Sequence, residues 1–218
     1  MAQPPTAAKI AAAARALLDR EGPEAVTMRR VADAVGITPM AIYRHYADRD
    51  ALLNALADHG FEELARALAR KGLPAAFEPR LLRLAAIYLD YSLANARLFE
   101  LMFLRPRRGA RRFPLDFKAG RSPTGNLFAA VVKQGMESGH LREDDHWEVT
   151  FELGALIEGL IMLYLGGRIE GRRAQVSALL RRSLRRHLHG IRKDPHDAPA
   201  VDDRRGSGLR AAPRVRRA

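Results

Sequence analysis

The feature that most constrains this chain is the stretch VTMRRVADAVGITPMAIYRHY, residues 26–46. Thr27 is a good helix N-cap, because its hydroxyl can accept a hydrogen bond from a free backbone N–H of the first turn. Apolar residues then recur at helical spacing, at Val31, Ala32 and Val35. Gly36 suits the left-handed position that commonly follows a helix. The first half of the stretch therefore predicts a short helix that ends at this glycine.

The second half of the stretch predicts another short helix after a tight turn. Thr38 can cap it, and Pro39 would stand at its first position, where the missing N–H costs nothing. Ile42 and Tyr46 are four residues apart and would face inward. Two helices joined in this way form a helix-turn-helix, whose second helix enters the major groove of DNA. A plain helical hairpin in an all-α core has the same shape, although exposed Tyr, Arg and His are poor core material.

The residues around this stretch resemble the N-terminal DNA-binding domain of the TetR/AcrR family of transcriptional repressors. The similar segments are KIAAAARALLDREG, VTMRRVADAVG, ITPMAIYRHY and ADRDALLNAL. The resemblance covers residues 6–65, with the helix-turn-helix at about 27–46, and implies an all-α fold. In that fold a three-helix domain is joined by a long helix to an α-helical ligand-binding and dimerisation domain, residues 66–191. Residues 192–218 are rich in Arg, Pro, Gly and Asp and are expected to form a disordered basic tail.

The resemblance also assigns the residues that would contact DNA. The phosphate-contacting positions are Thr27, Tyr43, His45 and Arg49. The positions that can reach base edges are Arg29, Thr38, Pro39, Met40 and Arg44. The chemistry of these side chains agrees with the assignment. Arginine offers two parallel donors to guanine, methyl groups suit thymine, and hydroxyl and imidazole groups suit phosphate.

Helical periodicity continues through the second half of the chain. It predicts helices within 77–104, over 122–139, over about 145–165 and over 172–190. The segment ELGALIEGLIMLYLGG resembles the closing helix of the ligand-binding domain called WHG, found in part of the family. The Trp and His of that signature are replaced here by Leu156 and Glu158.

The resemblance implies an effector cavity between the helices of this half. The candidate wall residues are Tyr88, Phe99, Met102, Phe103, Phe128, Trp147 and Glu158. Each of them also fits a plain role in the core, and the sequence leaves that alternative open. Glu158 is the strongest candidate, because a carboxylate within an apolar helix is costly to bury without a partner.

The net charge of +12 does not by itself identify the DNA-binding surface. Residues 1–58 carry seven basic and seven acidic side chains, whereas residues 172–193 carry eight basic and no acidic ones. Residues 105–121, RPRRGARRFPLDFKAGR, read as a solvated connection rich in Pro, Gly and Arg. A second nucleic-acid patch is the alternative for this segment.

Several classes of protein have no support in the sequence. The chain has no cysteine, and no apolar run is long enough for a signal peptide or a membrane span, which favours a cytoplasmic location. His187 and His189 are two apart on a helix, so their rings diverge, and Asp144 and Asp145 beside His146 fit a helix cap better than a metal site. We therefore expect no metal, no cofactor and no catalytic residue.

The function expected from the sequence is that of a DNA-binding transcriptional regulator, a repressor released from its operator by a small-molecule effector. The partners would be double-stranded operator DNA, the effector and a second copy of the chain. The dimer contact is expected on the helices near 145–165 and 172–190, with its core at Leu180, Leu184, Leu188, Phe151 and Ile161. A non-specific DNA-coating architectural protein and an enzyme are the alternatives.

Overall fold

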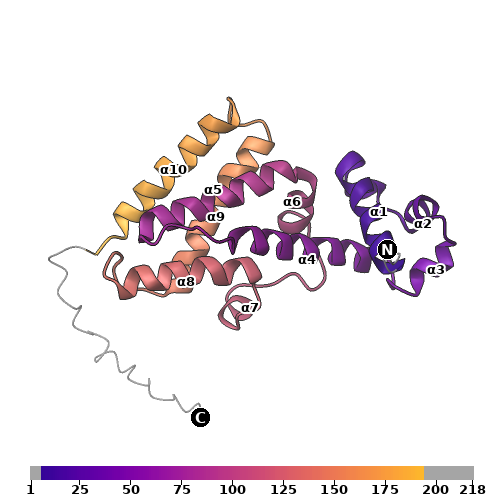
Figure 1. Ribbon diagram of the computed structural model, residues 1–218, viewed down its shortest axis with the longest axis horizontal. Coiled ribbons are helices and arrows are strands. Elements are labelled where there is room, and N and C mark those ends of the chain that lie inside the picture. The colour runs from indigo at the N-terminus through magenta and orange to yellow at the C-terminus, as the bar shows by residue number, and fades with distance from the viewer. Residues whose placement is uncertain (1–5, 194–218) are drawn as a thin grey trace, which may run out of the picture.

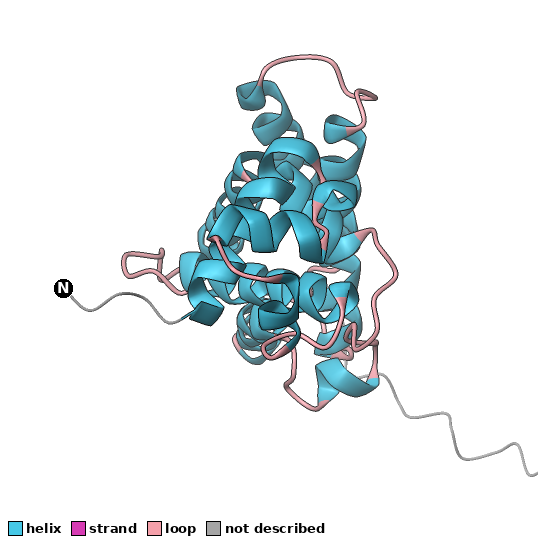
Figure 2. Ribbon diagram, turned by 90° about the vertical axis from the view of Figure 1, so that its right-hand side faces the viewer, coloured by secondary structure: helices cyan, strands magenta, loops and turns pink. Residues whose placement is uncertain are grey.

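The computed structural model describes residues 6–193, and within that range helices joined by loops make up the fold (Figures 1 and 2). The described residues form no β-sheet; their single β-bridge joins Leu141 to Arg192. The all-α prediction is thus confirmed, whereas all but the first two residues of the expected tail, 192–218, lie outside the described range. In chain order the elements are α1 Thr6–Glu21, the short 3-10 helix η1 Pro23–Ala25, α2 Met28–Val35, α3 Pro39–Tyr43, α4 Arg49–Leu68, α5 Phe77–Ala94, α6 Ala96–Phe103, α7 Leu115–Lys118, α8 Pro123–Glu137, α9 His146–Leu165 and α10 Arg173–Gly190.

The helix-turn-helix forms through the caps that its sequence predicts. The hydroxyl of Thr27 accepts a hydrogen bond from the backbone N–H of Arg30 at 3.3 Å, and that of Thr38 accepts one from Ala41 at 3.3 Å. Gly36 takes the left-handed conformation, with φ 75°, that ends α2. The turn that follows α3 still bonds back to Ile42, so the chain keeps coiling for a few residues after the helix ends.

Helix α4 joins the N-terminal helices α1, α2 and α3, the expected DNA-binding unit, to the rest of the chain, as Figure 1 shows. Its N-cap is Asp48, whose carboxylate accepts a hydrogen bond from Ala51 N–H at 2.7 Å. Its buried side chains first meet α1 and then α5, α6 and α8. At Gly60 a Cβ would stand 2.6 Å from the sulfur of Met102, so α6 packs this closely on α4 only because position 60 has no side chain.

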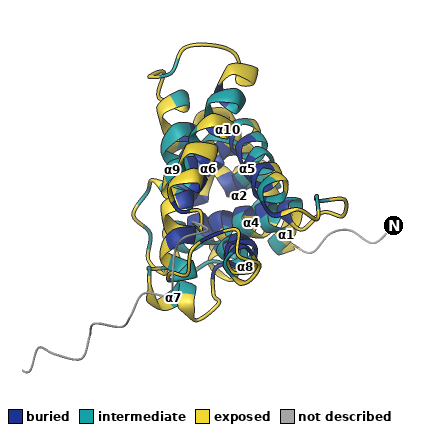
Figure 3. Ribbon diagram, turned by 90° about the vertical axis from the view of Figure 1, so that its left-hand side faces the viewer, coloured by how far each residue is buried: buried dark blue, intermediate teal, exposed yellow. Residues whose placement is uncertain are grey.

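The second half is a helical bundle in which α9 packs on α8 and α10, while α5 contacts α4, α8, α9 and α10. The buried residues, dark blue in the ribbon of Figure 3, lie on the inner sides of these helices. Asp145 caps α9 as predicted, accepting hydrogen bonds from the N–H groups of Trp147 and Glu148. The bundle therefore has its own apolar core, continuous with that of the DNA-binding unit through α4.

The leucines expected at the core of a dimer contact are instead buried inside one chain. Leu180, Leu184 and Leu188 are 2%, 0% and 5% exposed, and Ile161 is 0% exposed. Helix α10 covers α5 and α9 of its own chain, and these side chains fill the space between them. That part of the interface prediction is wrong, because the apolar stripe of α10 is satisfied within the protomer. The exposed apolar side chains of α9 are different residues: Phe151, Met162, Leu163 and Leu165.

Candidate DNA-binding surface and ligand cavity

The side chains predicted to touch DNA gather on an open surface of α2, α3 and the turn that follows. Seven of the nine are exposed: Arg29, Thr38, Pro39, Met40, Tyr43, Arg44 and His45. Met40 is 71% exposed and Tyr43 48%, so both side chains are open to contact from outside the chain. Thr27 is half-buried beneath them as the cap of α2.

Three side chains of this surface have no polar partner within the described part of the chain. Within the described residues, no hydrogen bond or ion pair engages the side chains of Arg29, Arg44 or His45. The neighbouring Arg30 differs, because its guanidinium donates two hydrogen bonds to Glu21 at 2.9 and 2.8 Å and lowers the pKa of that carboxyl. On this surface, Arg29 and Arg44 are therefore the arginines without a partner among the described residues, and both are predicted to reach base edges.

Arg49 differs from the expectation for a phosphate contact. Its Nε donates to the carbonyl oxygen of Val26 at 2.7 Å, and one Nη donates to the carbonyl oxygen of Pro23 at 2.7 Å. The same Nη lies 3.3 Å from a carboxylate oxygen of Glu24. The half-buried guanidinium thus ties the start of α4 to the turn before α2, and this internal role positions the helix-turn-helix.

The second half holds a partly open cavity of about 330 Å³ between α4, α5, α6, α8, α9 and residues 105–121. Six of the seven predicted wall residues line it: Tyr88, Met102, Phe103, Phe128, Trp147 and Glu158. The seventh, Phe99, is 1% exposed and does not reach the cavity. Its ring lies 4.7 Å from that of Phe103, between centroids, so Phe99 supports the wall from behind.

Segment 105–121 is a wall of this cavity, and the expectation of a merely solvated connection is wrong. Phe113 stacks on Phe151 of α9 with 4.4 Å between ring centroids, and Phe117 meets the edge of Trp147 at 6.2 Å. The sequence reading missed Phe61, Arg105, Arg107, Arg111, Phe113, Phe117 and Phe151 as cavity residues. A usable signal was present, since two phenylalanines four apart are unusual in a loop expected to face water.

One half-buried carboxyl, that of Glu158, belongs to the cavity wall. Tyr88 Oη donates a hydrogen bond to Glu158 Oε1 at 2.8 Å. Burial raises the pKa of Glu158 to about 7, and the hydrogen bond from Tyr88 opposes that rise. Burial and the nearby carboxyl also raise the pKa of Tyr88. The carboxyl is therefore partly neutral near pH 7, as expected for an acid held among apolar side chains.

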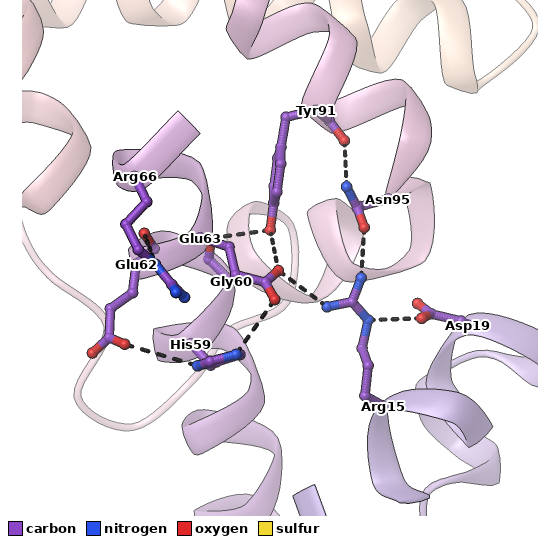
Figure 4. A network of polar contacts seen from close by, with 9 residues as sticks. All are labelled: Arg15, Asp19, His59, Gly60, Glu62, Glu63, Arg66, Tyr91 and Asn95. Carbon is purple, nitrogen blue, oxygen red and sulfur yellow. Dashed lines mark hydrogen bonds and ion pairs between the residues drawn. The ribbon is translucent and has the colours of Figure 1, made fainter. Parts of the chain in front are cut away.

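A polar network joins the DNA-binding unit to the bundle (Figure 4). Arg15 of α1 donates to Asn95 Oδ1 at 2.5 Å and to Glu63 Oε2 of α4 at 3.3 Å. Tyr91 of α5 donates to the same Glu63 oxygen at 3.0 Å, and Gly60 offers its carbonyl as a second acceptor at 3.1 Å. Three helices from both halves thus share one cluster of polar contacts.

A second set of polar contacts joins the cavity wall to the helices near the N-terminus. Arg105 pairs with Glu24 at 2.5 Å, in the turn directly before α2. Arg107 donates to Asn54 Oδ1 of α4 at 3.2 Å. The cavity segment is consequently bonded both to the base of the helix-turn-helix and to the connecting helix.

Within residues 6–193, no group of three or more His, Asp and Glu side chains is placed to hold a metal ion. The same residues include no helix with the length and apolar character needed to cross a bilayer.

Comparison with known proteins gives matches over both halves. Residues 10–56 match the family model for bacterial regulatory proteins of the tetR family, and residues 81–187 match that for a tetracyclin repressor-like C-terminal domain. A relative in Mycobacterium tuberculosis, the HTH-type transcriptional repressor Rv1474c, is 28% identical over 180 residues, which cover 79% of this chain and 89% of that protein.

Solved structures share the fold. A Rhodococcus sp. RHA1 protein of unknown function superposes with a TM-score of 0.74 at 25% identity, over 87% of this chain and 97% of that one. A tetR-family regulatory protein from Rhodococcus RHA1 gives a TM-score of 0.61 at 21% identity, over 88% and 100%. With the helix-turn-helix geometry and the two family-model matches, these findings show that the chain belongs to the TetR family of DNA-binding transcriptional regulators.

Proposed function

We propose that this regulator is a repressor that a small-molecule effector releases from its operator. The observation that carries the proposal is that one chain presents unpaired Arg29, Arg44 and His45 at an open surface and an aromatic-walled cavity in the other half. Further support comes from the name of the Mycobacterium tuberculosis relative, which is a repressor. We also propose residues 6–65 and 66–191 as the functional units, with α4 crossing from one to the other.

The protein would act as a homodimer through the uncovered side of α9. That side carries Ala155, Gly159, Met162 and Leu163, which the protomer leaves wholly or partly exposed. A Cβ at Gly159 would meet nothing within 4 Å, so a second helix has room to approach. For such a dimer to read successive major grooves, its two recognition helices α3 would have to lie about 34–36 Å apart.

Release would follow from a shift between two arrangements of the protomer. The cavity wall is bonded to the helix-turn-helix through Arg105 and Glu24, and α1 is bonded to α4 through Arg15 and Glu63. A ligand that binds better when these contacts are rearranged favours a different separation of the recognition helices. The exposed Arg105–Glu24 pair is worth little as an ion pair and can be exchanged at low cost.

The test is selection of bound sequences from a random pool of duplex DNA by the full-length chain. The proposal predicts a near-palindromic site whose half-sites are one helical turn apart. Affinity for that site should exceed affinity for random DNA by at least about a thousandfold at 150 mM salt. Equal binding to all sequences, with a steep salt dependence, would instead identify a DNA-coating protein.

A further inference from the structure

Three arginines of segment 105–121 line the cavity, and they differ in what their charges face. Arg105 pairs with Glu24 and Glu100, and Arg111 pairs with Asp58 at 3.4 Å. Arg107 forms no ion pair within 4 Å among the described residues. Arg107 is therefore the one arginine of the wall whose charge has no direct counterion in the described structure.

Arg107 is also partly removed from water. It is half-buried, and burial lowers the pKa of its guanidinium. One Nη donates to Asn54 Oδ1, but the buried Nε–H has no acceptor among the described residues. A buried donor without an acceptor is costly, more so on a charged group. An anion in the cavity beside this guanidinium would supply the missing counterion.

The rest of the cavity selects an apolar body. Eight aromatic side chains line it: Phe61, Tyr88, Phe103, Phe113, Phe117, Phe128, Trp147 and Phe151. The acidic side chain among the lining residues is Glu158, which already accepts a hydrogen bond from Tyr88. With burial favouring its neutral form, this carboxyl is a weak attraction for a cation.

We propose that the effector is an amphipathic carboxylate, whose apolar body lies against the aromatic walls and whose carboxylate accepts hydrogen bonds from Arg107. The inference rests on the proposed function only in calling the ligand an effector; binding itself is a separate property. A guanidinium matches a carboxylate with two parallel donors, which gives the head group a defined orientation. An alkyl chain and an aromatic ring are both suitable bodies.

The test measures binding without DNA. The chain has a single tryptophan, Trp147, and it lies in the cavity wall, so its fluorescence reports occupancy. The probes are decanoate and 2-naphthoate, each compared with the matching alcohol and the matching primary amine. The expected result is that at least one carboxylate binds tenfold or more tightly than its alcohol and its amine. Which body binds better distinguishes alkyl from aromatic effectors.

Arg107→Gln should weaken binding of the preferred carboxylate at least tenfold and leave the alcohol unchanged. Arg108→Gln is the matched control, because Arg108 is exposed and lies outside the cavity wall. Arg107→Lys keeps the charge without the paired donors and should lie between wild type and Arg107→Gln, which tests the role even if Arg107→Gln folds poorly. Equal binding of acid and alcohol, preference for the amine, or normal carboxylate binding by Arg107→Gln would each overturn the proposal.

The same samples separate this inference from the proposed function. If a carboxylate binds through Arg107 but leaves the selected operator complex intact, the ligand class stands and the release mechanism fails. If an amine or a neutral compound releases the operator while neither carboxylate binds, the ligand class fails and the repressor function stands.

Discussion

The two halves of the molecule hold their functional side chains in opposite ways. In the DNA-binding unit, Arg29, Arg44 and His45 project into water with no internal partner. In the bundle, Arg107 and Glu158 line a cavity and are half-buried. A solvated arginine costs nothing to leave unpaired, whereas a shielded one does. We therefore propose different roles for arginine in the two halves, contact with DNA in one and binding of a small anion in the other.

The largest expected effect is the loss of stability when a charge is placed in the apolar core of the bundle. Leu184 is fully buried, so Leu184→Glu should destabilise the protomer by more than about 4 kcal/mol, because a carboxylate would be placed in the apolar core. Thermal unfolding followed by circular dichroism measures this. Leu163→Glu, on the exposed side of α9, is the control and should stay helical at 25 °C while sedimenting as a monomer. A well-folded monomeric Leu184→Glu variant would return this leucine to the dimer contact.

A second prediction concerns the pH dependence of the shielded carboxyl. Since the pKa of Glu158 is raised to about 7 in the fold, its contribution to stability is fully present below its ordinary value near 4.5. That contribution is lost as pH rises through about 7. Glu158→Gln stays neutral, so its stability relative to wild type should increase by roughly 3 kcal/mol between pH 4.5 and pH 8. Urea unfolding across this range measures the difference, and a difference independent of pH would contradict the shifted pKa.

Substitutions on the DNA-binding surface should lower the affinity for DNA and hardly change the stability of the fold. Arg29→Ala should cost about 1–3 kcal/mol of operator affinity and relax the base preference at one position in each half-site. Tyr43→Phe should weaken binding to all sequences alike, because a phosphate contact carries no sequence information. Binding titrations against single-base variants of the selected operator compare the two. An unchanged preference in Arg29→Ala would remove the base contact from the proposal.

The smallest expected effect lies in a local cap. Thr38→Ala removes the hydroxyl that accepts a hydrogen bond from Ala41 N–H, which should cost about 1 kcal/mol of stability. Thr38→Ser keeps the acceptor and should be close to wild type. Chemical denaturation of both variants measures the cap. If both lose the same amount, the methyl group and not the hydroxyl matters at this position.

Sequence alone was sufficient for most of the long helices and for the caps that begin them, although not for the short helices η1 and α7. The caps at Thr27, Thr38 and Asp48 bond to backbone groups three residues away, so their effect is decided by neighbours in the chain. The left-handed turn at Gly36 is equally local. The family resemblance, read on the apolar faces of several helices, also pointed to six side chains that the fold gathers around one cavity.

Only the tertiary structure decided which helix covers each apolar face and which polar side chains already have partners within the chain. An apolar stripe such as that of α10 suits its own chain or a second copy equally well, and only the packing on α5 and α9 assigns Leu184 to the protomer. Arg49 is bonded to carbonyl groups that precede it by more than twenty residues, and segment 105–121 closes a cavity through rings on α9. Such contacts join residues far apart in the chain, and local sequence patterns carry no record of them.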